Sequence, residues 1–372
     1  MLHSRGRVLD VTSLDDLDRR LAEGVRSLAG WRVLRLDLTE RGPALLERSL
    51  AQSLFLGCEF AEGEDDAVRR AGGVVLHAIP DVPVDPYRAG LYSPAELYDA
   101  PRYEDTLDAR AYAWSRRGAG PEDALAMALH DHHVDAALGE WVAGREVVGV
   151  MGGHALERGS EAYADAARLG HTLAARLTVA TGGGPGAMEA ANLGAFVPGD
   201  ASGQASAALD AALAAVARVP SFRPDIGTWA RVALDVVEAT AGGRESLGIP
   251  TWHYGHEPPN PFATAIAKFF RNAPREALLL EVCTAGIVFL PGAGGTVQEV
   301  FQDACENYYA DRTSVAPMVL VGRRHWTEDL PVWPLLQALA RGRSMEPHVH
   351  LVDSVEEAVA VVVAEVSRRV DG

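Results

Sequence analysis

From residue 146 onward, short apolar segments alternate with helical sequence, and this alternation constrains the fold more than any other feature of the chain. Two of these segments, EVVGVM (146–151) and GIVFLPG (286–292), are apolar almost without interruption. Strands that are apolar on both faces are typical of a parallel sheet covered by helices on each side. The pattern therefore predicts a Rossmann-like, doubly wound α/β domain. We expect further strands at 177–181, 249–255, 316–322 and 349–353, and an amphipathic helix at 160–176.

The N-terminal part of the chain shows the same alternation in shorter elements. It predicts a small α/β domain over residues 1–100, which ends in the proline-rich stretch 80–94. Its strands are expected within 6–11, 31–38, 53–60 and 73–79, with helices within 13–28 and 62–72.

The larger domain is expected to span residues 101–372, beginning with a helical lead-in at 101–145. A segment at about 198–246 is longer than an ordinary connection between a strand and a helix. We interpret it as an inserted pair of helices over the carboxyl edge of the sheet, where ligands bind in such folds.

Composition and charge restrict the class of partner. The 372 residues are 48% hydrophobic and 23% charged, and no apolar run approaches the ~18–20 residues of a membrane helix. The N-terminal sequence has no apolar signal core, so we expect a cytoplasmic protein without a membrane partner. The net charge of −17 disfavours binding to DNA or RNA, because an acidic surface repels the phosphate backbone.

Cysteine and histidine residues do not indicate a metal site. Cys58, Cys283 and Cys305 have no metal-binding spacing and lie in apolar surroundings, which predicts reduced, buried thiols. The histidine and aspartate cluster at 130–135 lacks two good ligands at positions i and i+4 of one helix. We therefore interpret these histidines as solvated or interdomain residues, and we expect no metal.

The first of two glycine turns is TGGGPGAM (181–188), which leads from a strand into a helix. Exposed N–H groups at such a helix start suit a phosphate, although a tight turn without a ligand would also need glycines. The turn matches neither G-x-x-x-x-G-K-[ST] nor a clean G-x-G-x-x-G, so a triphosphate or dinucleotide is disfavoured.

The second glycine turn, PGAGGTVQE (291–299), is more informative because Glu299 follows it by one helical turn. Gly294, Gly295 and Thr296 can offer backbone N–H groups and a hydroxyl to a phosphate. Two interpretations of Glu299 remain open at this point. It is either a functional carboxylate or the partner of Thr296 in a capping box.

Three motifs in this order, GGGPGAME (182–189), EPPNP (257–261) and PGAGGTVQE, resemble the LONELY GUY (LOG) family, once labelled possible lysine decarboxylases. The likeness is greatest to the bacterial pyrimidine/purine nucleotide 5'-monophosphate nucleosidases, and it covers roughly residues 146–365. The resemblance implies hydrolysis of the N-glycosidic bond of nucleoside 5'-monophosphates, which gives a free base and ribose 5-phosphate. It also implies no metal, no organic cofactor and a homo-oligomer, at least a dimer.

The resemblance further implies a catalytic pair, Arg275 and Glu299. Glu299 aligns with the family's glutamate without a gap, whereas Arg275 aligns only if one extra residue is allowed before the following strand. Without that residue Glu276 takes the position, and Arg271 is then the alternative arginine. The implied substrate-binding residues are Gly152, Gly153, Gly182, Gly183, Gly184, Gly186, Met188, Glu257, Gly292, Gly294, Gly295 and Thr296.

Two positions of the second turn depart from the family pattern. Ala293 replaces a glycine, and Gly294 replaces a residue that is usually bulky. We expect the turn to persist with a slightly altered base or phosphate pocket.

The residue chemistry agrees with this activity. Cleavage of a ribose C1'–N bond develops oxocarbenium character, which a carboxylate such as Glu299 stabilises while it orients or deprotonates water. A neighbouring arginine can bind phosphate or base and keep the carboxylate ionised. A non-catalytic nucleotide-binding or carrier protein on the same scaffold is the alternative. A pyridoxal-phosphate decarboxylase is disfavoured because it would have to use Lys268, the only lysine, which lies in no supporting motif.

Overall fold

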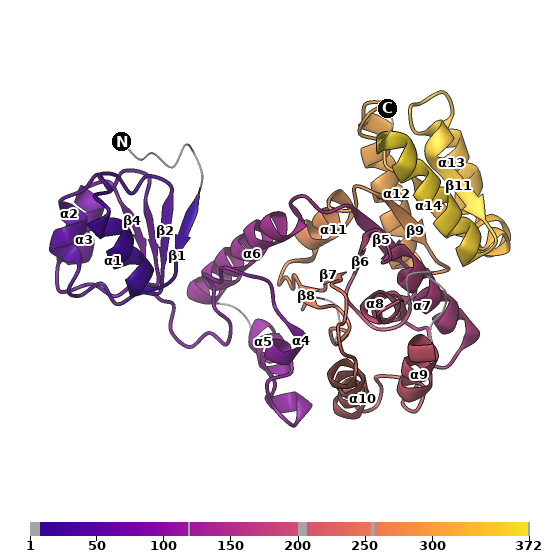
Figure 1. Ribbon diagram of the computed structural model, residues 1–372, viewed down its shortest axis with the longest axis horizontal. Helices are drawn as coiled ribbons and strands as arrows, with labels where there is room; N and C mark the ends of the chain where they lie inside the picture. The colour runs from indigo at the N-terminus through magenta and orange to yellow at the C-terminus, as the bar shows by residue number, and fades with distance from the viewer. Residues whose placement is uncertain (1–7, 118–119, 200–206, 254–256, 371–372) are drawn as a thin grey trace. The chain divides into compact units, whose positions relative to one another are not determined.

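The computed structural model describes residues 8–117, 120–199, 207–253 and 257–370 (Figure 1). They divide into two compact units, one formed by residues 8–89 with 120–133 and the other by residues 90–117 with 134–370. This division differs from a single boundary near residue 100. Residues 90–117 belong to the second unit, and the chain then returns to the first unit for residues 120–133.

Backbone pairing and ring packing explain the exchange. Tyr92 and Ile266 donate backbone hydrogen bonds to each other, with N···O distances of 2.9 and 2.8 Å, so the chain around residue 92 belongs to the second unit. Leu129 packs against an apolar cluster that contains Tyr87, and the His133 ring lies edge-on to Tyr87 at 5.7 Å. The beginning of the long helix α6 (Pro121–Val142) therefore belongs to the first unit.

The first unit contains a four-stranded parallel sheet in the order β1-β2-β3-β4, as expected for a small α/β domain. Each connection between consecutive strands carries one short helix. The elements are β1 (Leu9–Val11), α1 (Leu14–Ala22), β2 (Trp31–Leu34), α2 (Gly42–Leu46), β3 (Leu54–Leu56), α3 (Glu64–Arg70) and β4 (Val74–Leu76).

The strand register of this small sheet repeats. Leu9 pairs with Trp31, Arg32 with Leu54, and Leu54 with Val74, so the chain advances by 22, 22 and 20 residues per strand. Parallel strands that follow one another in chain order with a nearly constant advance are the arrangement of a solenoid. The sequence analysis did not detect this repeat.

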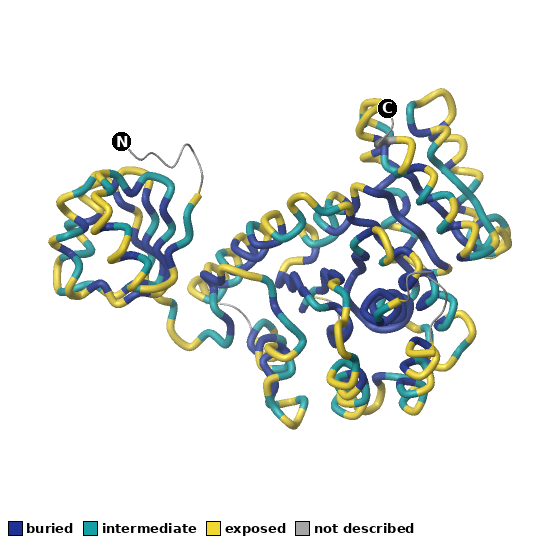
Figure 2. Tube along the Cα trace, in the orientation of Figure 1, coloured by how far each residue is buried: buried dark blue, intermediate teal, exposed yellow. Residues whose placement is uncertain are grey.

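The second unit contains seven parallel strands in the order β11-β10-β9-β5-β6-β7-β8. The strands are β5 (Val147–Met151), β6 (Thr178–Thr181), β7 (Leu247–Gly248), β8 (Ala265–Ile266), β9 (Gly286–Phe289), β10 (Met318–Val321) and β11 (Val349–Val352). Figure 2 shows most of these strands as buried, whereas the edge strand β11 is of intermediate burial and the covering helices carry exposed residues. The Rossmann-like, doubly wound α/β fold is therefore confirmed.

One expected strand is wrong in position. Instead of spanning 249–255, the strand ends at Gly248, because Pro250 has no N–H group with which to continue the ladder. Residues 249–253 form a connection that rejoins the sheet through a bridge between Thr251 and Phe269, and residues 254–256 lie outside the described residues. Strand β8 was not expected.

Helices of the second unit are α4 (Pro94–Leu97), α5 (Leu107–Ser115), α7 (Glu161–Leu173), α8 (Ala187–Phe196), α9 (Ala207–Val216), α10 (Ile226–Ala239), α11 (Asn272–Glu281), α12 (Gly294–Tyr309), α13 (Val332–Ala340) and α14 (Val355–Val370). The second unit also contains a π-helical turn (His325–Asp329) and two 3₁₀ turns (Tyr103–Asp105 and Glu346–His348).

Helices α7 and α8 make the most extensive helix–helix contact of the second unit. Ser160 caps α7 by accepting a hydrogen bond from the Tyr163 amide at 3.2 Å. At Gly194 a Cβ atom would overlap the carbonyl oxygen of Ala167, so only glycine permits this approach. Both helices join α14 and the strands in one apolar core.

The strand order determines where a ligand site is expected. From β5 the chain continues through β6, β7 and β8 on one side, and then returns to place β9 on the other side of β5. Ligands of doubly wound sheets bind at such a switch point, outside the carboxyl ends of the strands. The loops after β5, β6 and β9 meet there, and they contain both glycine turns.

The cysteine prediction is partly wrong. Cys58 and Cys283 are buried, as expected, but Cys305 is exposed on α12. Cys305 lies on the side of α12 that faces water, so the apolar residues next to it in the sequence do not bury it.

The histidine prediction is correct only in part. His132 is exposed, as expected, but His130 is fully buried and His133 nearly so, and therefore these two are not solvated. His133 donates from Nδ1 to the carbonyl of Leu129 at 2.8 Å, and His130 Nδ1 lies 3.0 Å from Asp131 Oδ1. Over the described residues, no group of three or more potential ligands is arranged to hold a metal, and no helix is long and apolar enough to cross a membrane.

Candidate active site

A pocket of about 440 Å³ lies at the switch point of the seven-stranded sheet, where the loops after β5, β6 and β9 meet. Its size is that of a small-molecule site. Eleven of the residues expected from the sequence line it, namely Gly152, Gly153, Gly182, Gly184, Met188, Glu257, Arg275, Gly294, Gly295, Thr296 and Glu299.

Three expected residues do not line this pocket. Gly186 lines a neighbouring cavity, whereas Gly183 and Gly292 line neither. Gly183 has a φ of +72°, and a Cβ atom there would lie 2.7 Å from Pro250. At Gly292 a Cβ atom would overlap the Thr296 side chain. Gly183 and Gly292 therefore shape the two turns instead of facing the pocket.

The start of α12 decides between the two interpretations of Glu299. Ala293 is the N-cap and Gly294 the first helical residue, so Thr296 lies inside the first turn. A residue inside the helix cannot act as the N-cap of a capping box. The capping-box interpretation is therefore wrong, and Glu299 remains a carboxylate that lines the pocket.

The first turn of α12 is open to a ligand. Gly294 and Gly295 are exposed, and an added Cβ atom at either would meet nothing within 4 Å. The first amides of a helix have no partner within it, and the helix dipole makes this end positive. This turn therefore has the properties of an anion site.

The glycine turn before α8 is packed more tightly. The Ala187 amide donates to the carbonyl of Gly153 at 3.1 Å, and a Cβ atom at Gly186 would lie 2.5 Å from that oxygen. One of the first amides of α8 is therefore used within the protein. Of the two turns, the one before α12 is better suited to a phosphate.

Arg275 lies on α11 and crosses one wall of the pocket. Its Nε donates to the carbonyl of Ile249 at 2.6 Å and its Nη2 to that of Gly182 at 3.2 Å, which fixes the guanidinium. Arg271, the alternative arginine, is exposed at the N-cap of α11 and does not line the pocket. The structure thus places Arg275, and not Arg271, in the same pocket as Glu299.

Glu299 has an unusual protonation equilibrium. Burial raises its pKa from 4.5 to about 7, against the lowering effect of the Arg275 charge and with a further raising effect from Glu276. Arg275 acts in the expected direction, but burial outweighs it. A carboxyl group that titrates near pH 7 can both hold and release a proton, as general acid–base catalysis requires.

Other ionisable groups near Glu299 are buried as well. Asp303, one helical turn further on, is only 4% exposed, and burial raises its pKa well above the ordinary range. The Cys283 thiol is also buried, and its pKa is raised for the same reason. Glu299 itself is of intermediate exposure and lines the pocket.

Several lining residues were missed by the sequence analysis. His154 and Ala155 follow the two glycines after β5, and Pro250 and Thr251 follow β7. The signal was available, since every residue that directly follows a strand of a doubly wound sheet is a candidate for the site. The expected strand began at residue 249 instead of residue 247, so Pro250 and Thr251 were placed inside the strand and not in the loop after it.

Lys268 lines neither the pocket nor the neighbouring cavity. It is fully buried and forms an ion pair with Asp108, which is also fully buried. Asp108 further accepts hydrogen bonds from Trp252 Nε1 and Tyr103 OH, both at 2.8 Å. A lysine enclosed in this way cannot reach a cofactor in either cavity, which argues against a pyridoxal-phosphate enzyme.

Comparisons with known proteins give no family. No family model matches the chain, and no curated protein matches it. Among solved structures, the molybdenum cofactor binding protein from the phototrophic bacterium Rippkaea orientalis is similar over 60% of this chain and 99% of its own. It is 16% identical with a TM-score of 0.36, and a similarity this low carries no information on function.

Proposed function

We propose that this protein hydrolyses the N-glycosidic bond of nucleoside 5'-monophosphates to a free base and ribose 5-phosphate, as the resemblance to the LOG family implies. One observation carries the proposal. Glu299, with a pKa of about 7, shares a pocket with the fixed guanidinium of Arg275 and the open start of α12. The anion site and the acid–base group are thus within one ligand length of each other.

The phosphate is assigned to the first turn of α12, on the backbone N–H groups of Gly294, Gly295 and Thr296. Glu299 follows Thr296 by three residues on the same helix. One turn of α-helix rises about 5.4 Å, so a phosphate at the helix start leaves the ribose C1' beside the Glu299 carboxyl group.

In the reaction, the C1'–N bond breaks and its electron pair leaves with the base nitrogen. The Glu299 carboxylate stabilises the positive charge that develops on the ribose, and it accepts a proton from the attacking water. The water oxygen forms the new bond to C1', and the proton passes to the departing base. The positive charge of Arg275 stabilises the ionised form of Glu299, which burial disfavours.

The alternative is a nucleotide-binding or carrier protein without turnover. Such a protein could bind phosphate at the open turn of α12 equally well. Binding alone, however, does not require a carboxyl group that gains and loses a proton near pH 7. The Glu299 pKa therefore favours the enzyme.

The test is incubation of the purified protein with AMP, GMP, IMP, CMP and UMP, followed by chromatography of the released base and assay of ribose 5-phosphate. We expect turnover that falls more than ~10²-fold in Glu299→Gln, a typical loss for such a group. Glu356→Gln, an exposed glutamate on α14, is the matched control and should retain turnover. Nucleotide binding without any release of base would support the carrier instead.

We also expect at least a homodimer, since the family implied by the resemblance assembles through helices. Light scattering at micromolar concentration gives the mass, and a monomer would contradict this expectation.

A further inference from the structure

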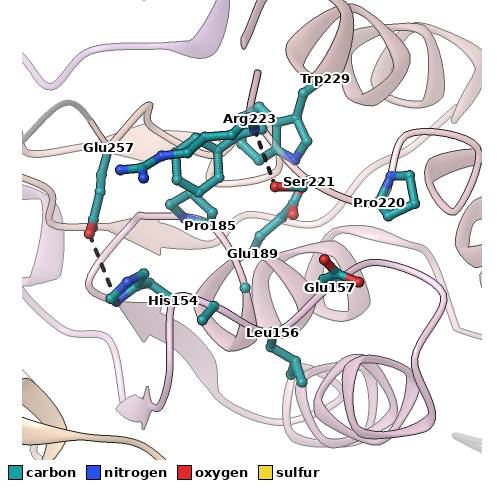
Figure 3. A pocket seen from close by; sticks show the side chains of 13 residues that line it. His154, Leu156, Glu157, Pro185, Glu189, Pro220, Ser221, Arg223, Trp229 and Glu257 are labelled. Atoms are coloured by element: carbon teal, nitrogen blue, oxygen red, sulfur yellow. Dashed lines mark hydrogen bonds and ion pairs between the residues drawn. The ribbon is translucent and has the colours of Figure 1, made fainter. Parts of the chain in front are cut away.

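A second cavity, of about 280 Å³, adjoins the candidate active site (Figure 3). His154, Ala155 and Glu257 line both cavities, so the two are neighbours on either side of these residues. The opposite wall comes from the inserted segment that contains α9 and α10. Its contributing residues are Pro220, Ser221, Phe222, Arg223 and Trp229.

A buried ion pair fixes the inserted segment against the sheet. Arg158, in the loop after β5, donates from Nε to Glu189 of α8 at 3.0 Å, and both residues are at least 97% buried. Its Nη1 also donates to the carbonyls of Trp229 at 3.1 Å and Val219 at 3.4 Å. One guanidinium thus joins the loop after β5, α8 and the insertion, and the cavity is formed before a ligand arrives.

The cavity carries one cation that is available to a ligand. Within the described part of the chain, the Arg223 guanidinium forms no hydrogen bond or ion pair, and it only lies over the Phe222 ring at 5.5 Å. In Figure 3 it points toward the side from which Glu257 enters the cavity. Glu257 itself makes a long contact of 3.8 Å with His154.

The charges in this cavity disfavour a phosphate. Glu157 and Glu257 both line it, and two carboxylates repel an anion, whereas the start of α12 offers a phosphate exposed backbone amides. A neutral group that accepts hydrogen bonds from a guanidinium and donates them to a carboxylate fits these walls.

We infer that this cavity receives the base of the nucleotide, and that Arg223 together with Glu257 selects a 6-oxopurine, guanine or hypoxanthine. The inference rests on the proposed function, because the base extends from C1' beside Glu299 and the shared lining residues lead from there into this cavity.

The hydrogen-bonding pattern of the base carries the selection. The O6 and N7 atoms of a 6-oxopurine are two adjacent acceptors, which a guanidinium binds as a pair. Its N1–H, joined in guanine by the 2-amino group, donates to a carboxylate. Adenine places an amino group where O6 would be, so two donors would face each other at Arg223.

The experiment measures kcat/KM and calorimetric Kd for GMP, IMP and AMP in the wild type and in Arg223→Ala. We expect the wild type to prefer GMP and IMP over AMP by about 10-fold or more. Loss of a bidentate guanidinium contact should reduce that preference by about 10–100-fold. Arg223→Lys should lose most of the preference as well, because a lysine cannot form the paired contact.

Arg218→Ala is the matched control, because Arg218 is exposed on the same insertion, donates to the Ala215 carbonyl and lines neither cavity. It should leave the preference unchanged. A wild type that prefers AMP, or an Arg223→Ala variant that weakens all three nucleotides equally, would overturn the base assignment while hydrolysis stands. If no nucleotide is hydrolysed, the proposed function fails, and the Kd ratios still decide the base assignment.

Discussion

Glu299 should reduce the stability of the folded protein above neutral pH, and Glu299→Gln should restore it. Between pH 4.5 and about 7 the folded state binds a proton that the unfolded state has already released, since burial raises the folded pKa. The free energy of unfolding therefore falls as pH rises through this window and then levels off. Glutamine has no charge to desolvate, so the variant lacks this dependence.

The size of the effect follows from the shift. The pKa moves from 4.5 to about 7, and each pKa unit corresponds to ~1.4 kcal/mol. At pH 8 the variant should be more stable than the wild type by about 3 kcal/mol. At pH 5, near the lower end of the window, the two proteins should agree within about 1 kcal/mol.

Urea unfolding at pH 5 and pH 8, followed by circular dichroism, measures both differences. In thermal unfolding we expect a gain of about 6–12 °C at pH 8, because 1 kcal/mol corresponds to about 2–4 °C for a domain of this size. Glu356→Gln, whose side chain is exposed, should show no comparable gain. A Glu299→Gln protein that is less stable than the wild type at pH 8, or equally shifted at both pH values, would refute the reasoning.

Three further predictions concern other contacts. Arg158→Met should cost about 3–5 kcal/mol in urea unfolding, because it leaves the buried Glu189 carboxylate unpaired; a cost below about 1 kcal/mol would contradict the pair. Glu276→Gln removes a charge that raises the Glu299 pKa, so the rise of turnover with pH should move to lower pH, and a move to higher pH would oppose this. Gly194→Ala should destabilise by about 1–3 kcal/mol through overpacking of α7 against α8; an unchanged melting temperature would mean that the helices separate freely.

The sheet and the position of the pocket were predictable from the sequence, because both follow from local patterns. Apolar strands such as 286–292 identify a parallel sheet, and a glycine turn that directly follows a strand lies at its carboxyl edge. The pocket is indeed lined by Gly182 after β6 and by Gly294 after β9. The advance of about 22 residues in the first unit was also present in the sequence, but the repeats share little beyond their apolar positions.

Features that depend on distant contacts were not predictable. Whether α12 begins at Gly294 or only after Thr296 decides whether Glu299 can belong to a capping box, and both starts are compatible with the residues alone. The Glu299 pKa depends on burial by the fold around it. The partner of Arg158 lies 31 residues away, on another helix, and a single sequence gives no sign of it.

Because Lys268 is enclosed, its reaction with an added reagent can report on local opening of the second unit. This residue is the only lysine among 372 residues, and it is fully buried against Asp108. An amine-reactive acylating reagent can modify its side chain only after that part of the second unit opens, so the rate of acylation at this one position measures the opening reaction. Mass spectrometry of the peptide that contains Lys268 would follow local unfolding without an introduced label, and a bound ligand that stabilises the unit would slow the modification.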